Sequence, residues 1–210
     1  MKKILSVLIL LQLSLAVYAQ KTITLNGYGA YVFDDKFDTY YSSTDYVYGK
    51  IKGGFMWGAG LEVRIREDYG GELAYFRLDT QAPIESYTRN RTIDLGVNYI
   101  MLGGVRYLKL ANEKLEPYGG LLLGMAIFNN KNPQFSEESS ATKFAWGARL
   151  GTNIWVSEKV GLKLQAYVLS AVQGAGGGLY VGTGGAGAGV STYSTLYQFG
   201  LGGGLVVKLN

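Results

Sequence analysis

Apolar and polar side chains alternate through residues 55–66. Phe55, Trp57, Ala59, Leu61, Val63 and Ile65 are apolar, and the residues between them, apart from Met56, are glycine or charged. Successive side chains of a β-strand point to opposite faces, so this stretch predicts a strand with one apolar face and one small or charged face. Similar segments occur at residues 22–33, 53–66, 71–79, 92–108, 115–128, 144–156, 161–170 and 195–209. The chain therefore predicts eight strands. The facing of the third and fifth is ambiguous because both of their faces are rather apolar.

The connections between these strands alternate in length. Short turns are expected at residues 67–70, 111–114 and 157–159, and long loops at residues 34–52, 80–91, 129–143 and 171–193. Outer-membrane β-barrels have short periplasmic turns and long outer loops, and bacterial ones have an even number of strands. The fold that we expect is all-β: an eight-stranded antiparallel up-and-down transmembrane β-barrel.

A soluble lipocalin-like barrel would show the same alternation with its apolar face turned inward. Two features favour the membrane barrel. The polar faces are rich in glycine, which suits a narrow lumen that is filled by neighbouring side chains. Charged residues make up only 17% of the chain, which is low for a surface in water. A closed sheet can also face lipid, because closure leaves no unpaired backbone edge in the hydrocarbon.

The N-terminus has the features of a secretory signal peptide. Lys2 and Lys3 precede an apolar run over residues 4–17, and Ala19 fits a cleavage position. We expect residues 1–19 to be removed and residues 20–210 to form the outer-membrane β-barrel domain. The alternative is an N-terminal membrane anchor, but the run is short for a spanning helix.

Composition restricts the chemistry. The chain has no His and no Cys, so it lacks the usual general base near neutral pH, the commonest metal ligand and any thiol. The formal net charge of +4 includes Lys2 and Lys3 of the expected signal peptide, and no basic run indicates nucleic acid binding. We therefore expect no enzymatic activity, no cofactor, no metal site and no nucleic acid partner.

Charged and amide side chains on the polar faces are the candidate site residues. We expect a lumen network of Glu62, Arg64, Asp94, Asn98, Arg106, Arg149 and Lys163. The lipid-facing residues that we expect are Phe55, Trp57, Leu61, Val63, Leu95, Val97, Trp146 and Leu150. Charges inside a low-dielectric wall are costly unless they are paired. The first interpretation is thus a salt-bridged network that closes the lumen, and the alternative is a narrow selective pore.

The first long loop is rich in tyrosine. Its candidate contact residues are Tyr40, Tyr41, Tyr46 and Tyr48. Tyrosine supplies amphipathic contact area in binding loops, and it is also typical of the membrane interface. These four residues are therefore either contacts to an extracellular partner or members of the outer aromatic girdle.

Three segments resemble the strands of a known family. Residues 53–62, 118–124 and 144–151 are similar to strands of small outer-membrane barrels of the outer membrane protein A and X type. The resemblance implies location in the cell outer membrane, contact with outer-membrane lipid and insertion by the barrel assembly machinery. The alternation of Leu205, Val207 and Leu209 resembles the family's C-terminal insertion signal, although the chain ends in Asn210 rather than Phe.

Two functions are compatible with these patterns. One is a structural or surface-interaction role through the long extracellular loops. The alternative is a narrow pore, or transport of a small apolar ligand across the outer membrane.

Overall fold

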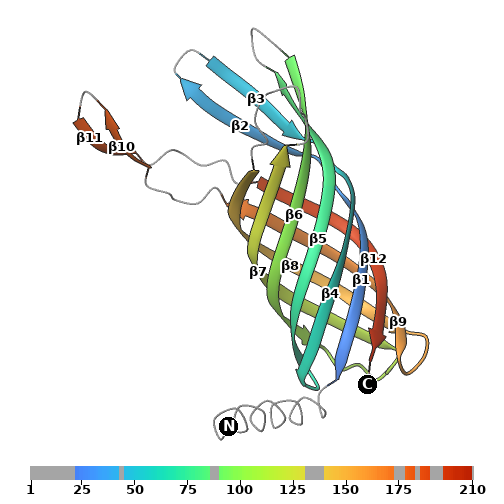
Figure 1. Cartoon of the computed structure of the whole chain (residues 1–210). Helices are drawn as coiled ribbons and strands as arrows, with labels where there is room; N and C mark the ends of the chain where they lie inside the picture. Colours follow the sequence, from blue (N-terminus) through green and yellow to red (C-terminus); the bar gives the residue numbers. More distant parts are fainter. Residues whose placement is uncertain are drawn as a thin grey trace, which may run out of the picture.

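Eight long antiparallel strands form a closed barrel (Figure 1). The computed structural model describes residues 22–42, 45–85, 90–130, 140–172, 178–182, 185–189 and 196–209. The barrel strands are β1 (Ile23–Val32), β4 (Gly54–Arg66), β5 (Tyr69–Glu85), β6 (Asn90–Tyr107), β7 (Leu115–Asn130), β8 (Ser140–Trp155), β9 (Val160–Val172) and β12 (Leu196–Lys208). Each pairs with the next barrel strand along the chain, and β1 pairs with β12 to close the ring. The predicted eight-stranded up-and-down barrel is confirmed, whereas the predicted signal peptide, residues 1–19, lies outside the described residues.

Four shorter strands lie outside the ring. β2 (Asp35–Ser42) and β3 (Asp45–Ile51) form a hairpin, and β10 (Gly178–Gly182) pairs with β11 (Gly185–Gly189). The hairpin β2–β3 joins the main sheet where β3 pairs with the far end of β5. The first long connection therefore contains regular structure that the sequence pattern did not predict. β5 and β6 also pair along their whole lengths, up to Glu85 and Asn90, beyond the expected strand ends.

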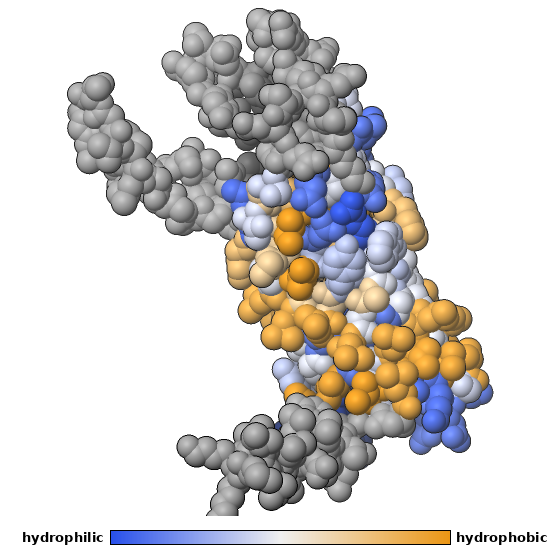
Figure 2. Space-filling view, viewed as in Figure 1, coloured by the Kyte–Doolittle hydropathy of each residue, from blue (hydrophilic) through white to orange (hydrophobic). Residues whose placement is uncertain are grey.

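Large apolar side chains cover the outside of the barrel. In β4, burial alternates residue by residue, with Phe55, Trp57 and Leu61 exposed and Met56, Gly58 and Gly60 buried. The face seen in Figure 2 carries a broad belt of hydrophobic residues toward the turn end and hydrophilic residues toward the long connections. Burying such a belt in hydrocarbon removes it from water, and the closed ring leaves no backbone edge unpaired. No helix in the described part of the chain is long and apolar enough to span a membrane.

The interior of the barrel has two layers. Toward the long connections it is apolar, with buried side chains that include Met56, Phe76, Leu78, Val97, Tyr99, Met101 and Leu169. Toward the short turns it is polar, with buried Asn26, Glu62, Glu72, Arg149, Asn153, Lys163 and Gln165. The polar layer is the candidate site.

The facing that we expected for residues 92–108 was wrong. Val97, expected in lipid, is fully buried in the interior, and Leu95 packs against the same apolar cluster. Ile100 and Leu102 are the exposed apolar residues of β6. The reason is the layering: near the long connections the interior is apolar, while the outer face of β5 and β6 there carries polar side chains such as Arg77 and Asn98. Polarity therefore identifies the lipid side only within the belt.

Candidate functional site: the polar layer of the lumen

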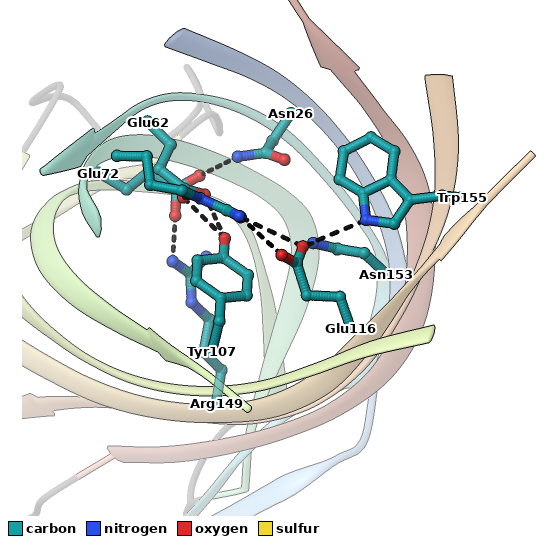
Figure 3. Close-up of polar contacts among 9 residues, drawn as sticks. Asn26, Glu62, Glu72, Tyr107, Glu116, Arg149, Asn153 and Trp155 are labelled. Carbon is teal, nitrogen blue, oxygen red and sulfur yellow. Dashed lines mark hydrogen bonds and ion pairs between the residues drawn. The ribbon is translucent and has the colours of Figure 1, made fainter. Parts of the chain in front are cut away.

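Glu72 is the centre of the polar layer (Figure 3). This carboxylate on β5 accepts a hydrogen bond from Asn26 Nδ2 of β1 at 2.9 Å. It also accepts one from the Tyr28 hydroxyl, on the same strand as Asn26. Its other oxygen forms an ion pair with the Arg149 guanidinium from β8. Arg149 also donates to the Tyr28 hydroxyl at 3.2 Å. Glu72 thus links three strands across the lumen, and it is fully buried.

A second carboxylate lies directly beside it. Glu62 of β4 is the cross-strand partner of Glu72. The Tyr107 hydroxyl lies 2.7 Å from each Glu62 carboxylate oxygen and donates its hydrogen bond to this carboxylate. Like charges opposite each other on neighbouring strands repel. Different cations face the two carboxylates: Arg149 pairs with Glu72, whereas Arg64 lies 4.0 Å from Glu62. The arrangement therefore places a positive charge beside each of the two negative charges.

Arg64 connects Glu62 to a third acid at the turn end. Its guanidinium holds Glu116 of β7 in a bidentate contact, at 2.6 and 3.2 Å. The guanidinium carbon also lies 3.9 Å from the centre of the Tyr107 ring. Glu116 accepts two further bonds, from Asn153 Nδ2 at 3.0 Å and from the Trp155 indole at 3.3 Å. Planar bidentate pairs of this kind fix geometry as well as charge.

Lys163 completes the layer from β9. Its ammonium lies 4.4 Å from the centre of the Tyr118 ring and 5.8 Å from that of Tyr28. Such cation–π contacts are stronger when the cation is removed from water, as this buried one is. With Lys163 included, the layer holds three acids, Glu62, Glu72 and Glu116, and three bases, Arg64, Arg149 and Lys163. Its formal charges therefore balance.

Glycines make room for these side chains. A Cβ at Gly60 would overlap the Glu72 carboxylate, and a Cβ at Gly151 would lie 2.7 Å from the Tyr118 hydroxyl. Both glycines are on inward-facing positions. The glycine-rich polar faces of the strands are thus where large polar side chains from neighbouring strands cross the lumen.

The structure brings together four of the seven expected network residues, Glu62, Arg64, Arg149 and Lys163. Asp94, Asn98 and Arg106 lie on the opposite face of β6, because the facing of that strand was inverted. Asn98 accepts from the Tyr75 hydroxyl at 2.8 Å and from Arg77 at 2.7 Å, and Asp94 accepts from Gln81 at 3.1 Å. These contacts lie on the outer surface of β5 and β6. Arg106 is exposed at the turn end of β6.

Six of the eight expected lipid-facing residues lie on the outer face: Phe55, Trp57, Leu61, Val63, Trp146 and Leu150. The expected network did not include the other members of the polar layer, namely Asn26, Tyr28, Glu72, Tyr107, Glu116, Tyr118, Asn153 and Gln165. The side chains of Tyr40, Tyr41, Tyr46 and Tyr48 lie outside the described residues, so their expected role stays a prediction. Within the described ranges, His, Cys, Asp and Glu side chains form no group that could hold a metal ion.

A hollow of about 640 Å³ opens at the turn end, below the polar layer. Arg64, Tyr107 and Glu116 form part of its wall, and an exposed ion pair between Glu67 and Lys109 lies at its rim. The hydrogen bond from Lys109 lowers the pKa of the Glu67 carboxyl. The hollow therefore gives water access to the lower side of the polar layer.

Comparisons with known proteins agree with this architecture. No family model matches the sequence, and no curated protein matches it. Among solved structures, Neisserial surface protein A is similar at 18% identity, with a TM-score of 0.59, over 89% of this chain and 97% of that one. Outer membrane protein OprG from Pseudomonas aeruginosa is similar at 14% identity, with a TM-score of 0.58, over 90% and 96% of the two chains.

A third solved structure, outer membrane protein AlkL, is 13% identical with a TM-score of 0.53 and covers 91% of each chain. At identities this low, the similarity is one of fold. The fold and the apolar belt agree with the resemblance to small outer-membrane barrels that was noted in the sequence, and with location in the outer membrane. The chain has the architecture of the small eight-stranded outer-membrane β-barrels.

Proposed function

We propose that this protein is a non-enzymatic outer-membrane barrel whose lumen is closed by its own side chains. Its role is structural, or it presents a surface to other molecules through the connections opposite the short turns. The observation that carries the proposal is the burial of the inward-facing side chains. Each of the eight barrel strands contributes to the two interior layers, and Glu62, Glu72 and Tyr99 among them are fully buried.

The polar layer supports closure energetically. Removing one partner of a buried ion pair leaves an uncompensated charge, which costs several kcal/mol. Opening a path between Glu72 and Arg149 would require breaking such a pair together with the bonds to Asn26 and Tyr28. A spontaneous opening of this layer is therefore rare.

The other end of the barrel supports a surface role. β5 and β6 extend past the apolar belt, and the hairpin β2–β3 continues the sheet from β5. A paired sheet holds its exposed residues in fixed positions, which lowers the entropic cost of binding a partner. We propose that an extracellular partner, whose identity the geometry leaves open, contacts this extension. The barrel assembly machinery remains the expected partner for insertion.

The lack of His and Cys supports a non-enzymatic role. Catalysis by a Ser–His or Cys–His pair is excluded by the sequence.

Conductance in planar bilayers tests the closed lumen. We expect the parent protein to give no steady current. A quadruple variant should conduct ions if it folds, because it truncates large side chains in both layers. Its substitutions are Tyr99→Ala, Met101→Ala, Tyr118→Ala and Arg149→Ala. Leu102→Ala, which shortens an outward-facing side chain, should behave like the parent. Reproducible current steps from the parent would overturn the proposal.

One observation favours a second candidate, the transport of a small apolar ligand. The layer of the lumen near the long connections is lined by apolar side chains, including Met56, Leu78 and Leu169. Ligand entry would require these side chains to rearrange. Saturable binding of a hydrophobic fluorescent probe, abolished by Leu78→Asp, would support transport, and unsaturable partitioning equal to that of empty micelles would favour the closed barrel.

A further inference from the structure

The outer wall of the barrel has a groove in the face formed by β6, β7 and β8. It has a volume of about 590 Å³ and faces the surrounding lipid. Gly104 and Gly119, both outward-facing, line it together with leucines. The Tyr69 ring covers Gly104, where a Cβ would lie 2.5 Å from the Tyr69 hydroxyl, and a Cβ at Gly119 would lie 3.2 Å from Leu150 Cδ2. Because Gly119 has no side chain, a ligand beside Leu150 can approach the backbone there.

The leucines of this groove are highly exposed. Leu102, Leu121 and Leu150 are 66%, 68% and 71% exposed, among the highest values of the large apolar residues. Leu121 and Leu150 flank the two glycines, because Gly104 pairs with Leu121 and Gly119 pairs with Leu150 across the strands. A narrow apolar hollow of this kind matches a hydrocarbon chain better than water.

A positive charge lies at the turn end of the groove. Arg106 lines the groove and is the cross-strand partner of both Gly119 and Tyr69. It precedes the last residue of β6, so it lies at the turn end of the barrel wall. Within the described part of the chain, no carboxylate forms an ion pair with it. A guanidinium at this depth is placed to bind phosphate oxygens through two parallel hydrogen bonds.

We propose that this groove binds one anionic phospholipid of the periplasmic leaflet. One acyl chain lies along the groove over Gly119, between the leucines and the Tyr69 ring, and the headgroup phosphate contacts Arg106. The geometry fits this occupant because the charge is at the bilayer edge and the apolar hollow extends from it toward Leu102 and Leu123, deeper in the membrane. Tyr69, beside Arg106, is a residue type that favours the headgroup level. Short turns of outer-membrane barrels lie in the periplasm, which assigns the leaflet.

Native mass spectrometry of the folded protein in micelles, titrated with dioleoyl-phosphatidylglycerol, tests the site. We expect one phosphatidylglycerol to bind in preference to the rest. Arg106→Gln should weaken that first binding about tenfold, the loss of one charge-assisted contact. Gly119→Leu, which adds a side chain inside the groove, should weaken it to a similar extent.

Two matched variants control for charge and for added bulk. Arg66→Gln removes an exposed arginine at the turn end of β4, and Gly27→Leu adds a leucine to β1 where a Cβ would meet nothing within 4 Å. Both should bind the lipid as the parent does. Heat-modifiable migration in gels verifies that each variant is folded, and Gly119→Ala replaces Gly119→Leu if the latter fails. Equal binding by the parent and the folded test variants would overturn the proposal, as would a loss from Arg106→Gln with none from the Gly119 variant.

Discussion

Replacing Glu72 with alanine tests the energetic role of the polar layer. The substitution removes the carboxylate that pairs with Arg149 and accepts from Asn26 and Tyr28. Within the described part of the chain, Arg149 Nε already has no hydrogen-bond partner, so the buried guanidinium would keep only its bond to Tyr28. Breaking a buried pair from one side costs about 3–5 kcal/mol. We expect Glu72→Ala to lower the free energy of unfolding by about that amount.

The measurement is equilibrium urea unfolding in lipid vesicles, followed by tryptophan fluorescence. Glu72→Leu combined with Arg149→Met should recover most of the loss, because a buried pair replaced by apolar residues leaves no charge unpaired. Glu67→Ala is the control, since it breaks an exposed ion pair with Lys109 and should leave the urea midpoint unchanged. An unchanged midpoint for folded Glu72→Ala would refute the reasoning, and so would a double variant as unstable as the single one.

Two further substitutions probe the wall of the barrel. Leu61→Arg on the outer face should reduce stability in bilayers by about 2–4 kcal/mol if it lies near the midplane, and folding into vesicles as complete as the parent's would contradict its lipid-facing assignment. Gly60→Val should displace the Glu72 carboxylate and cost about 1–3 kcal/mol, whereas Gly27→Val, with open space around its Cβ, should unfold at the parental urea concentration. If the two glycine variants unfold alike, the close approach at Gly60 is unimportant.

The strands of the barrel could be predicted because the apolar belt imposes alternation on them. In β4 the belt is directly visible: Trp57 and Leu61 face lipid, and Glu62 faces the lumen. The same logic located Arg149 and Lys163, whose neighbours along β8 and β9 are apolar and outward-facing.

The facing of β6 could not be predicted in the same way. Asn98 is polar and outward, and Tyr99 is aromatic and inward, which reverses the pattern of β4. The alternation of apolar and polar residues separates the two faces of a strand, but it does not tell which face meets lipid. Near the long connections the interior is apolar as well, so the apolar face of β6 could not be assigned to lipid or lumen. Glu72 was missed for a related reason, because its strand was expected to have two apolar faces. The available signal was a glycine on the polar face of a neighbouring strand, such as Gly60, which leaves space that the Glu72 side chain fills.

The equal numbers of acids and bases in the polar layer have a consequence for ions. A passage lined by an excess of one sign attracts counter-ions and repels co-ions, and this is how charged rings make a channel selective. Here Glu62, Glu72 and Glu116 are offset by Arg64, Arg149 and Lys163, so the layer has no formal net charge to favour either sign. A fluctuation that briefly admitted water would therefore let potassium and chloride pass with similar ease. This balance fits the proposed role of the layer as a seal rather than as a selectivity filter.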